Sequence, residues 1–151
     1  MDARFPVRLG VNAVIVEDDH LLAVKFDDDS GMHYNLPGGG VNQGESVTDA
    51  LVREVYEETT ADIEVGPLMF VHEYFPPAHS HVYGSTHKLT LFFEGCLTGA
   101  RSPTLPERPD QHQVGVEWLP VETIDTQPLL PELDVWGEII NGHASARFVG
   151  R

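Results

Sequence analysis

The glycine-rich stretch LPGGGVNQGES, which begins at Leu36, constrains the fold and chemistry of this chain more than any other segment. Gly39 and Gly44 have the spacing of the two glycines in a phosphate-binding loop, and Ser46 stands where that motif has a hydroxyl. The residue that should be lysine is instead Glu45, whose carboxylate would repel a phosphate. The segment therefore indicates close approach of the backbone to a ligand, but it requires another source of positive charge.

The residues that follow, Ser46 to Thr60, are predicted to form a helix. Ser46 is a suitable N-cap, and Asp49 three residues later approximates a capping box. Good helix formers continue without Pro or Gly. Apolar residues at intervals of four form a row that should face the core: Val47, Leu51 and Val55.

The same helix carries Glu54, Glu57 and Glu58, which at about 100° per residue fall within an arc of roughly 100°. A solvated acidic face is the ordinary alternative, but the arc overlaps the apolar row, so we expect the acids to continue the inward face. Carboxylates about 5 Å apart repel by roughly 3 kcal/mol at an effective dielectric constant of about 20. Protonation or a divalent cation would relieve this repulsion, and clustered oxygen ligands suit Mg²⁺ or Mn²⁺. Such a cation would also reconcile Glu45 with a phosphate.

Most other segments are predicted to be strands, with a second helix near the end, which indicates an α+β protein with a mixed sheet flanked by helices. The expected strands are Val7–Val16, Leu21–Phe26, Met32–Leu36, Asp62–Phe75, Thr86–Leu97 and Val114–Leu119. The second helix is expected over Pro131–Asn141, with Gly142 just past its end. Residues 1–151 are predicted to be a single domain, with a core over about 7–141 and a flexible tail over 142–151.

The strongly negative charge of the chain excludes some classes of binding partner. Nine Lys and Arg against 24 Asp and Glu give a net charge of -15, which argues against polymeric nucleic acid as a partner. The single cysteine, Cys96, cannot form an internal disulfide and fits a reducing cytosol; we expect it to pack in its strand. No apolar run approaches the roughly 18 residues of a membrane span. We therefore expect a soluble, cytoplasmic protein, for which a small anionic substrate remains open if cations screen the site.

The spacing from Gly39 to Glu58 resembles a known motif. Gly39, five residues, Glu45, seven residues and then Arg53-Glu54-Val55-Tyr56-Glu57-Glu58 is similar to the Nudix box, G-x5-E-x7-R-E-U-x-E-E-x-G-U, where U is aliphatic. Leu36-Pro37-Gly38-Gly39 and Trp118-Leu119-Pro120 also look like features of the Nudix family. Thr60 departs from the pattern, because the box has glycine there, and a β-branched residue resists the left-handed helix end that glycine provides. We therefore expect a different helix exit.

The resemblance implies the Nudix fold, an α/β/α sandwich, and a Mg²⁺- or Mn²⁺-dependent pyrophosphohydrolase. Such enzymes cleave a diphosphate bond in a nucleoside diphosphate linked to another moiety, by attack of water at phosphorus. The triphosphate of a nucleoside and a nucleotide sugar both fit, and a homodimer is left open. Carried over by position, the implied catalytic residues are Glu45, Arg53, Glu54 and Glu57, and the implied metal ligands are the Gly39 carbonyl, Glu54, Glu57 and Glu58. Glu54 would also orient or deprotonate the water, and Arg53 would pair with Glu45.

Some further residues are either part of the active site or ordinary surface residues. Some members of the Nudix family take an extra carboxylate from the loop before the last strand, where the candidates in this chain are Glu107, Asp110 and His112. The candidates for a nucleotide or leaving-group pocket are His79, His81, His87, Tyr74 and Tyr83. Glu117 is expected to face outward, and Trp118 and Trp136 to lie in the core. Two other readings remain: a Nudix-fold module that binds or senses a nucleotide metabolite without catalysis, and an acidic interaction protein.

Overall fold

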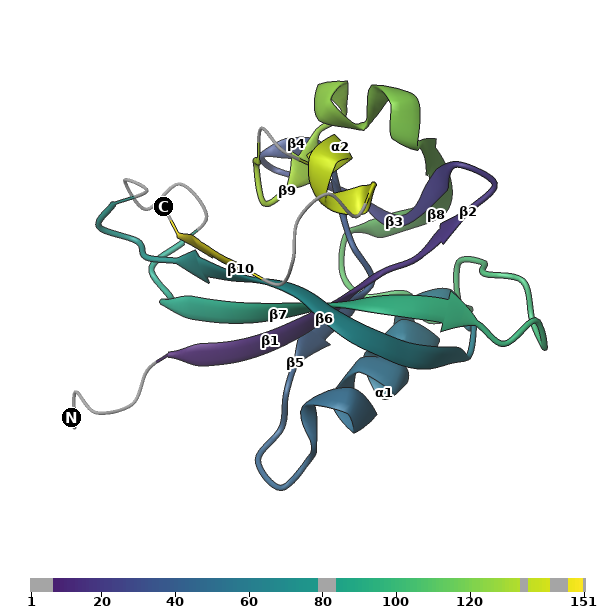
Figure 1. Cartoon of the computed structure of the whole chain (residues 1–151), viewed down its shortest axis with the longest axis horizontal. Coiled ribbons are helices and arrows are strands. Elements are labelled where there is room, and N and C mark those ends of the chain that lie inside the picture. Colours follow the sequence, from purple (N-terminus) through teal and green to yellow (C-terminus); the bar gives the residue numbers. More distant parts are fainter. Residues whose placement is uncertain (1–6, 79–83, 134–135, 142–146, 151) are drawn as a thin grey trace.

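Two mixed β-sheets and two α-helices make up the computed structural model, which describes residues 7–78, 84–133, 136–141 and 147–150 (Figure 1). The elements in chain order are β1 (Arg8–Val14), β2 (Val16–Glu17), β3 (His20–Asp28), β4 (Gly31–Asn35), β5 (Gly38–Gly40), α1 (Val47–Thr59), β6 (Ile63–Tyr74), β7 (Lys88–Leu97), β8 (Gln113–Pro120), the 3-10 helix η1 (Val121–Thr126), β9 (Leu129–Leu130), α2 (Trp136–Ile140) and β10 (Arg147–Gly150). The first sheet has the order β10-β6-β7-β1-β5, and the second has β2-β3-β4-β9 with β8 paired to β3.

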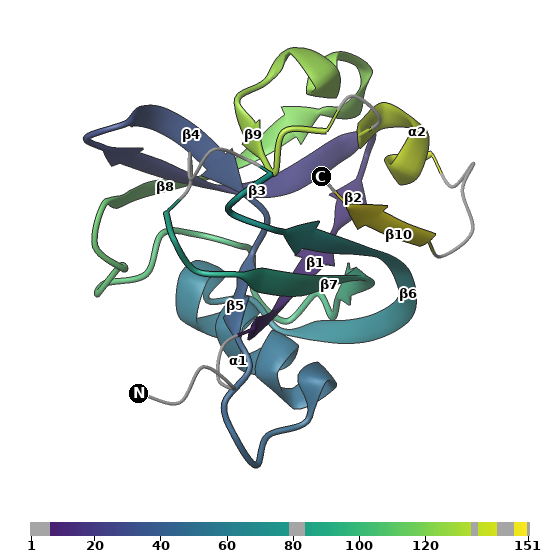
Figure 2. The same ribbon diagram turned by 90° about the vertical axis from the view of Figure 1, so that its left-hand side faces the viewer.

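The first sheet is buried on both faces. Figures 1 and 2 place α1 on one side of it and α2 on the other. Leu51 and Val55 of α1 pack with alternate residues of β1 such as Val11, whereas Trp136 of α2 packs on the stacked rings of Phe70 and Phe92. Because successive side chains of a strand point to opposite faces, each central strand contributes to both clusters. The mixed sheets and helices confirm the predicted α+β class.

The predicted strands are present, with boundaries that differ by a few residues. One difference bears on the site, because Gly38–Gly40 was expected to be a loop and instead forms β5. Gly38, Gly39 and Gly40 pair antiparallel with Asn12, Val11 and Gly10 of β1. A glycine run carries no side-chain pattern that would indicate a strand, so only the partner strand reveals it.

The N-terminus of α1 agrees with the sequence, and its C-terminus does not. The Ser46 hydroxyl accepts a hydrogen bond from the Asp49 N–H at 3.0 Å, which confirms the predicted N-cap. Thr60, however, adopts the left-handed conformation (φ 62°, ψ 2°) that we expected it to avoid. Its N–H donates to the Tyr56 carbonyl at 2.8 Å, so the helix ends as it would with glycine. The expectation of a different exit was wrong, because the hydrogen bond and the buried neighbours Thr59 and Ala61 hold Thr60 in place.

The C-terminal region also departs from prediction. The helix expected over 131–141 is limited to α2, and residues 121–126, for which no element was predicted, form η1. Gly142 lies outside the described residues. Residues 147–150, which the sequence places in a flexible tail, form β10 and pair in parallel with Phe70 to Glu73 of β6. Four residues with no local partner give no strand signal, because their hydrogen bonds go to a segment more than 70 positions earlier.

The burial of individual side chains agrees with the sequence-based predictions for the two tryptophans and differs for the cysteine. Trp136 is buried in the core, and Trp118 is partly buried against the cluster around α1. Cys96 is exposed, not packed, because it pairs with Glu64 at the end of the β6–β7 ladder, beyond the core. Glu117 accepts a hydrogen bond from Tyr34 at 2.7 Å and pairs with Lys25.

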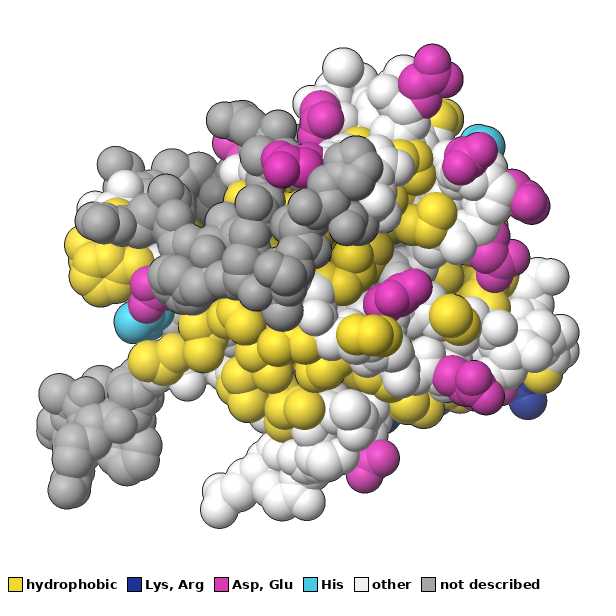
Figure 3. Space-filling model, viewed as in Figure 1, with side chains coloured by type: hydrophobic (Ala, Val, Ile, Leu, Met, Phe, Trp, Pro, Cys, Tyr) yellow, Lys and Arg dark blue, Asp and Glu magenta, His cyan; other side chains and the backbone are white. Residues whose placement is uncertain are grey.

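Acidic side chains are spread over the face shown in Figure 3, where Lys and Arg scarcely appear. Among the described residues, no helix has the length and apolar character needed to cross a membrane.

Replacement of Thr60 by glycine should stabilise the protein. A β-branched residue in the left-handed region costs roughly 1–2 kcal/mol, while glycine adds entropy to the unfolded chain. We expect Thr60→Gly to raise the free energy of unfolding by about 1 kcal/mol in urea denaturation. Thr60→Val keeps the strained backbone and should show no gain. Equal or lower stability of the glycine variant would contradict the assigned strain.

Candidate active site

Close contact between α1 and β5 depends on the lack of a side chain at Gly39. A Cβ atom added to Gly39 would lie 2.5 Å from the carboxylate carbon of Glu54. The Glu54 side chain is only 16% exposed. Burial raises the pKa of Glu54, and its contact with Arg53 opposes this change. The helix therefore presents a partly desolvated acid directly to the glycine backbone.

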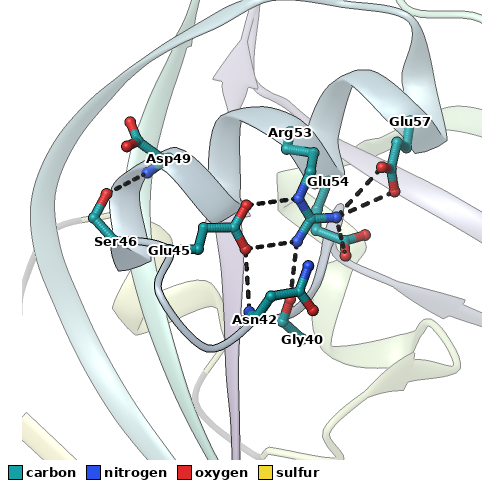
Figure 4. A network of polar contacts seen from close by, with 8 residues as sticks. All are labelled: Gly40, Asn42, Glu45, Ser46, Asp49, Arg53, Glu54 and Glu57. Atoms are coloured by element: carbon teal, nitrogen blue, oxygen red, sulfur yellow. Dashed lines mark hydrogen bonds and ion pairs between the residues drawn. The ribbon is translucent and has the colours of Figure 1, made fainter.

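Arg53 is the centre of a network that joins the loop after β5 to the helix (Figure 4). Its Nε and Nη2 donate to the two carboxylate oxygens of Glu45 at 2.7 and 2.9 Å. Nη2 also donates to the Gly40 carbonyl at 3.1 Å, and Nη1 donates to Glu54 at 2.8 Å. The predicted Glu45–Arg53 pair is thus present and bidentate, a geometry specific to arginine. These hydrogen bonds lower the pKa of Glu45 to about 2.

Glu58 is the most deeply placed acid of α1, with 6% of its surface exposed. Its Oε1 accepts a hydrogen bond from the Gly38 N–H at 2.8 Å. Within the described ranges, Oε2 accepts no hydrogen bond. Burial raises the pKa of Glu58 to about 8; the Gly38 hydrogen bond opposes this, and the charges of Asp110, Glu54 and Glu57 add to it. A buried, half-satisfied carboxylate surrounded by other acids is costly unless a positive group joins it.

The loop between β7 and β8 brings Asp110 to these acids. Its charge raises the pKa of both Glu54 and Glu58, which shows that the three carboxylates are within electrostatic reach. Gln113 fixes this arrangement, because its Nε2 donates to the Glu58 carbonyl at 2.8 Å and its Oε1 accepts from the Asp110 N–H at 3.2 Å. Sequence analysis missed Gln113, since a glutamine at a strand start gives no signal before its partner is known.

Of the three candidates in that loop, Asp110 alone has a recorded interaction with the acids of α1 among the described residues. Glu107 is exposed. His112 has a positive φ of 68°, and its charge acts on Asp28 of β3 instead. The structure therefore narrows the search for an extra carboxylate to one residue.

The position of Glu57 bears on whether the acids of α1 are already placed to bind a cation. Its side chain is 54% exposed and accepts from Arg53 Nη1 at 3.3 Å, so Arg53 links Glu54 and Glu57. In the part of the chain that is described, no group of three or more His, Cys, Asp or Glu side chains is placed to hold a metal ion. The expected cage of Glu54, Glu57 and Glu58 is therefore not preformed.

The donor chemistry nevertheless fits a hard divalent cation. The free oxygen of Glu58 is buried, Glu54 lies against Gly39, and both carboxylates carry raised pKa values that added positive charge would reverse. Mg²⁺ and Mn²⁺ prefer such oxygen ligands and retain water in the remaining positions. Glu54, Glu57, Glu58 and the Gly39 carbonyl could hold such an ion.

A cavity of about 500 Å³ lies beside these residues, and both Glu58 and the glycines of β5 line it. Its volume suits a small-molecule ligand. The lining residues that carry polar or aromatic groups are Arg8, Asn12, Asn35, Glu58, His72, Tyr74, Lys88, Thr90, Phe92 and Glu132. Gly10, Leu36, the three glycines of β5 and residues 130–133 form the rest of the wall.

Of the residues predicted to line a nucleotide or leaving-group pocket, one lines the cavity and another does not. Tyr74 lines the cavity and donates to the Gly84 carbonyl at 2.8 Å. His87 pairs with Glu73 at 2.8 Å and is not part of the lining. The remaining candidates, His79, His81 and Tyr83, lie outside the described residues. Sequence analysis did not single out Arg8, His72 or Lys88, because only strand register brings them to one cavity.

Comparison with known proteins gives a consistent result. The NUDIX domain model matches residues 6–137. Nudix hydrolase 5 of Arabidopsis thaliana is 29% identical over 126 residues, which cover 80% of this chain and 39% of that protein, so the chain spans about two fifths of the length of this relative.

Solved structures show the same fold. An ADP-ribose pyrophosphatase from Streptococcus suis superposes with a TM-score of 0.67 at 22% identity, covering 94% of this chain and 98% of that one. A MutT NUDIX hydrolase from Burkholderia pseudomallei gives a TM-score of 0.72 at 24% identity, covering 89% and 98%.

The Glu45–Arg53 pair should make stability depend on acid pH. The pKa of Glu45 falls from an ordinary value of 4.5 to about 2 in the folded protein. The stability it contributes is therefore complete above the unfolded pKa, and it is lost as pH falls through about 2. We expect the Tm difference between the wild type and Glu45→Gln to be largest above pH 5 and to shrink toward pH 2. Glu107→Gln serves as a control with no difference. A Tm difference for Glu45→Gln that does not vary with pH would contradict the pairing.

Proposed function

The chain belongs to the Nudix family, and on this premise we propose that it is a metal-dependent pyrophosphohydrolase. It would cleave a diphosphate bond in a nucleoside diphosphate linked to another moiety, by attack of water at phosphorus. The observation that carries the proposal is Glu58, a buried acid one of whose oxygens accepts no hydrogen bond from the described residues. It lies within electrostatic reach of Glu54, Glu57 and Asp110 and lines a ligand-sized cavity. A protein that only presents an acidic surface has no need to bury such a group.

Glu54, Glu57, Glu58 and the Gly39 carbonyl are the proposed ligands of Mg²⁺ or Mn²⁺. Neutralisation of the phosphate charge and activation of water are what the cation supplies when bound. Glu54 accepts the proton of the attacking water in this proposal, because its side chain is largely buried, its pKa is raised, and it lies beside Gly39. Asp110 is the further carboxylate that can orient the water.

Arg53 and Glu45 act by position. The guanidinium of Arg53 donates to four residues from three segments, which fixes the loop after β5 against the helix: Gly40, Glu45, Glu54 and Glu57. Since the hydrogen bonds of Arg53 go to Glu45, to the Gly40 carbonyl and to the two acids Glu54 and Glu57, we propose that Arg53 and Glu45 hold the site in place instead of touching the substrate.

The choice of substrate is supported only at the level of class. The cavity volume suits a nucleotide derivative, and both a nucleoside triphosphate and a nucleotide sugar are substrates in this proposal. The net charge of -15 argues against polymeric nucleic acid. A single domain and a cytoplasmic location remain predictions from the sequence, and the question of a homodimer stays open.

Loss of one acid of α1 should abolish most activity. Glu58→Gln keeps the oxygen that accepts from Gly38 but removes the charge, so the fold should be preserved while kcat falls about 100-fold or more. The measurement is release of phosphate-containing products from a panel of nucleoside triphosphates and nucleotide sugars, with Mg²⁺ and with EDTA.

Glu64→Gln, on the outer end of β6, serves as a charge-matched control and should retain full activity. Hydrolysis that persists in EDTA, or full activity of Glu58→Gln, would contradict the mechanism. Binding of a nucleotide without its cleavage would instead favour the sensing module.

Asp110→Asn and Glu107→Gln separate the two acids of the β7–β8 loop. We expect kcat to fall about tenfold or more for Asp110→Asn, because its charge acts on Glu54 and Glu58, and to be unchanged for Glu107→Gln. Steady-state kinetics with the best substrate of the panel provide the measurement. Equal effects of the two substitutions would remove Asp110 from the site.

A further inference from the structure

Arg8 and Lys88 are two of the nine basic residues of a strongly acidic chain, and both line the cavity. They lie on adjacent parallel strands and are direct register partners in the β1–β7 ladder. Like charges directly opposite one another on neighbouring strands are destabilising. A cation pair in this position therefore requires an anion, or it lowers stability without benefit.

The glycine at position 40 leaves space for the side chain of Arg8. A Cβ atom added to Gly40 would collide with the guanidinium of Arg8, so the missing side chain leaves the space that Arg8 fills. Because successive strand residues face opposite ways, the guanidinium lies on the face of β5 opposite to Glu54, which faces Gly39. Arg8 is thus only one strand residue away from the carbonyl proposed as a metal ligand.

Neither cation has an acidic partner in the described ranges of the chain. The side chain of Arg8 makes no hydrogen bond or ion pair there, and neither does that of Lys88. By contrast, Arg53 and Lys25 both pair with acids, at 2.7 and 3.4 Å. Two acids, Glu58 and Glu132, also line the cavity, yet neither forms an ion pair with Arg8 or Lys88.

We propose that Arg8 and Lys88 form a subsite that binds a phosphoryl group of the substrate at the end of the cavity beyond Gly40. The proposal rests on the proposed function, because it assumes that the nucleotide derivative lies in this cavity. It implies that the substrate is held from two sides: by a cation at the acids of α1, and by protein cations at the start of β1 and β7. The phosphoryl group can come from the diphosphate itself or from a further phosphate on the nucleoside.

Binding measured without metal tests this subsite separately from catalysis. The probes are inorganic pyrophosphate and adenosine 3′,5′-bisphosphate, titrated calorimetrically in EDTA into the full chain. We expect the double variant Arg8→Gln/Lys88→Gln to weaken binding about tenfold or more, because charge-assisted hydrogen bonds are lost. The matched control is Lys25→Gln/Arg101→Gln, which removes the same two charges outside the cavity and should leave binding within about twofold. Tm values confirm that both variants are folded.

The source of the phosphoryl group follows from the pair of probes. Weaker binding of both probes assigns the subsite to the diphosphate, whereas weaker binding of the bisphosphate alone assigns it to a further phosphate. In hydrolysis with Mg²⁺, the double variant should raise KM about tenfold with kcat nearly unchanged.

Equal losses in the two double variants, or no binding of either probe to the wild type, would overturn the subsite. If the wild type binds the probes but hydrolyses nothing, the proposed function fails and the subsite stands. If the wild type hydrolyses nucleotides and the double variant has an unchanged KM, the proposed function stands and the subsite fails.

Discussion

The close approach of α1 to the glycine strand β5 is the constraint on which the rest of the site depends. Any side chain at Gly39 would occupy the position of the Glu54 carboxylate, and any at Gly40 would displace the guanidinium of Arg8. The Gly38 N–H meets Glu58 at 2.8 Å from the same short strand. The three glycines thus admit two acids of α1, Glu54 and Glu58, and the cation Arg8, while pairing with β1 fixes the position of the strand.

The acidic residue that seemed misplaced in a phosphate-binding loop has a structural explanation. Both oxygens of the Glu45 carboxylate accept hydrogen bonds from one edge of the Arg53 guanidinium, which also donates to the Gly40 carbonyl and to Glu54. Positive charge is therefore provided first by arginine, which orders the loop, and is proposed to come next from a divalent cation at the acids beyond it. Glu58 shows why the second charge is needed, since its burial raises the pKa to about 8.

Local features of this chain could be predicted from its sequence, and features set by distant pairing could not. The helix and its Ser46 cap follow from the local residue pattern, because their partners lie within a turn of helix, and the Glu45–Arg53 pair was implied by the resemblance to the Nudix box. Thr60 was misjudged because propensity alone ignores the packing that holds an unfavourable residue. The cavity residues Arg8 and Lys88 meet only through strand register, and β10 exists only because β6 offers an edge. Asp110 was one candidate among three until Gln113 was seen to fix its loop to Glu58.

The central claim is that the acids of α1 form the binding site of a divalent cation, although Arg53 links two of them in this structure. Titration of the protein with Mn²⁺, followed by electron paramagnetic resonance without nucleotide, tests it most directly. The account predicts saturable binding by the wild type, and an affinity at least about tenfold lower for a variant with glutamine at Glu57, since one charged ligand is lost. Absence of saturable binding, or the same affinity in both proteins, would contradict it.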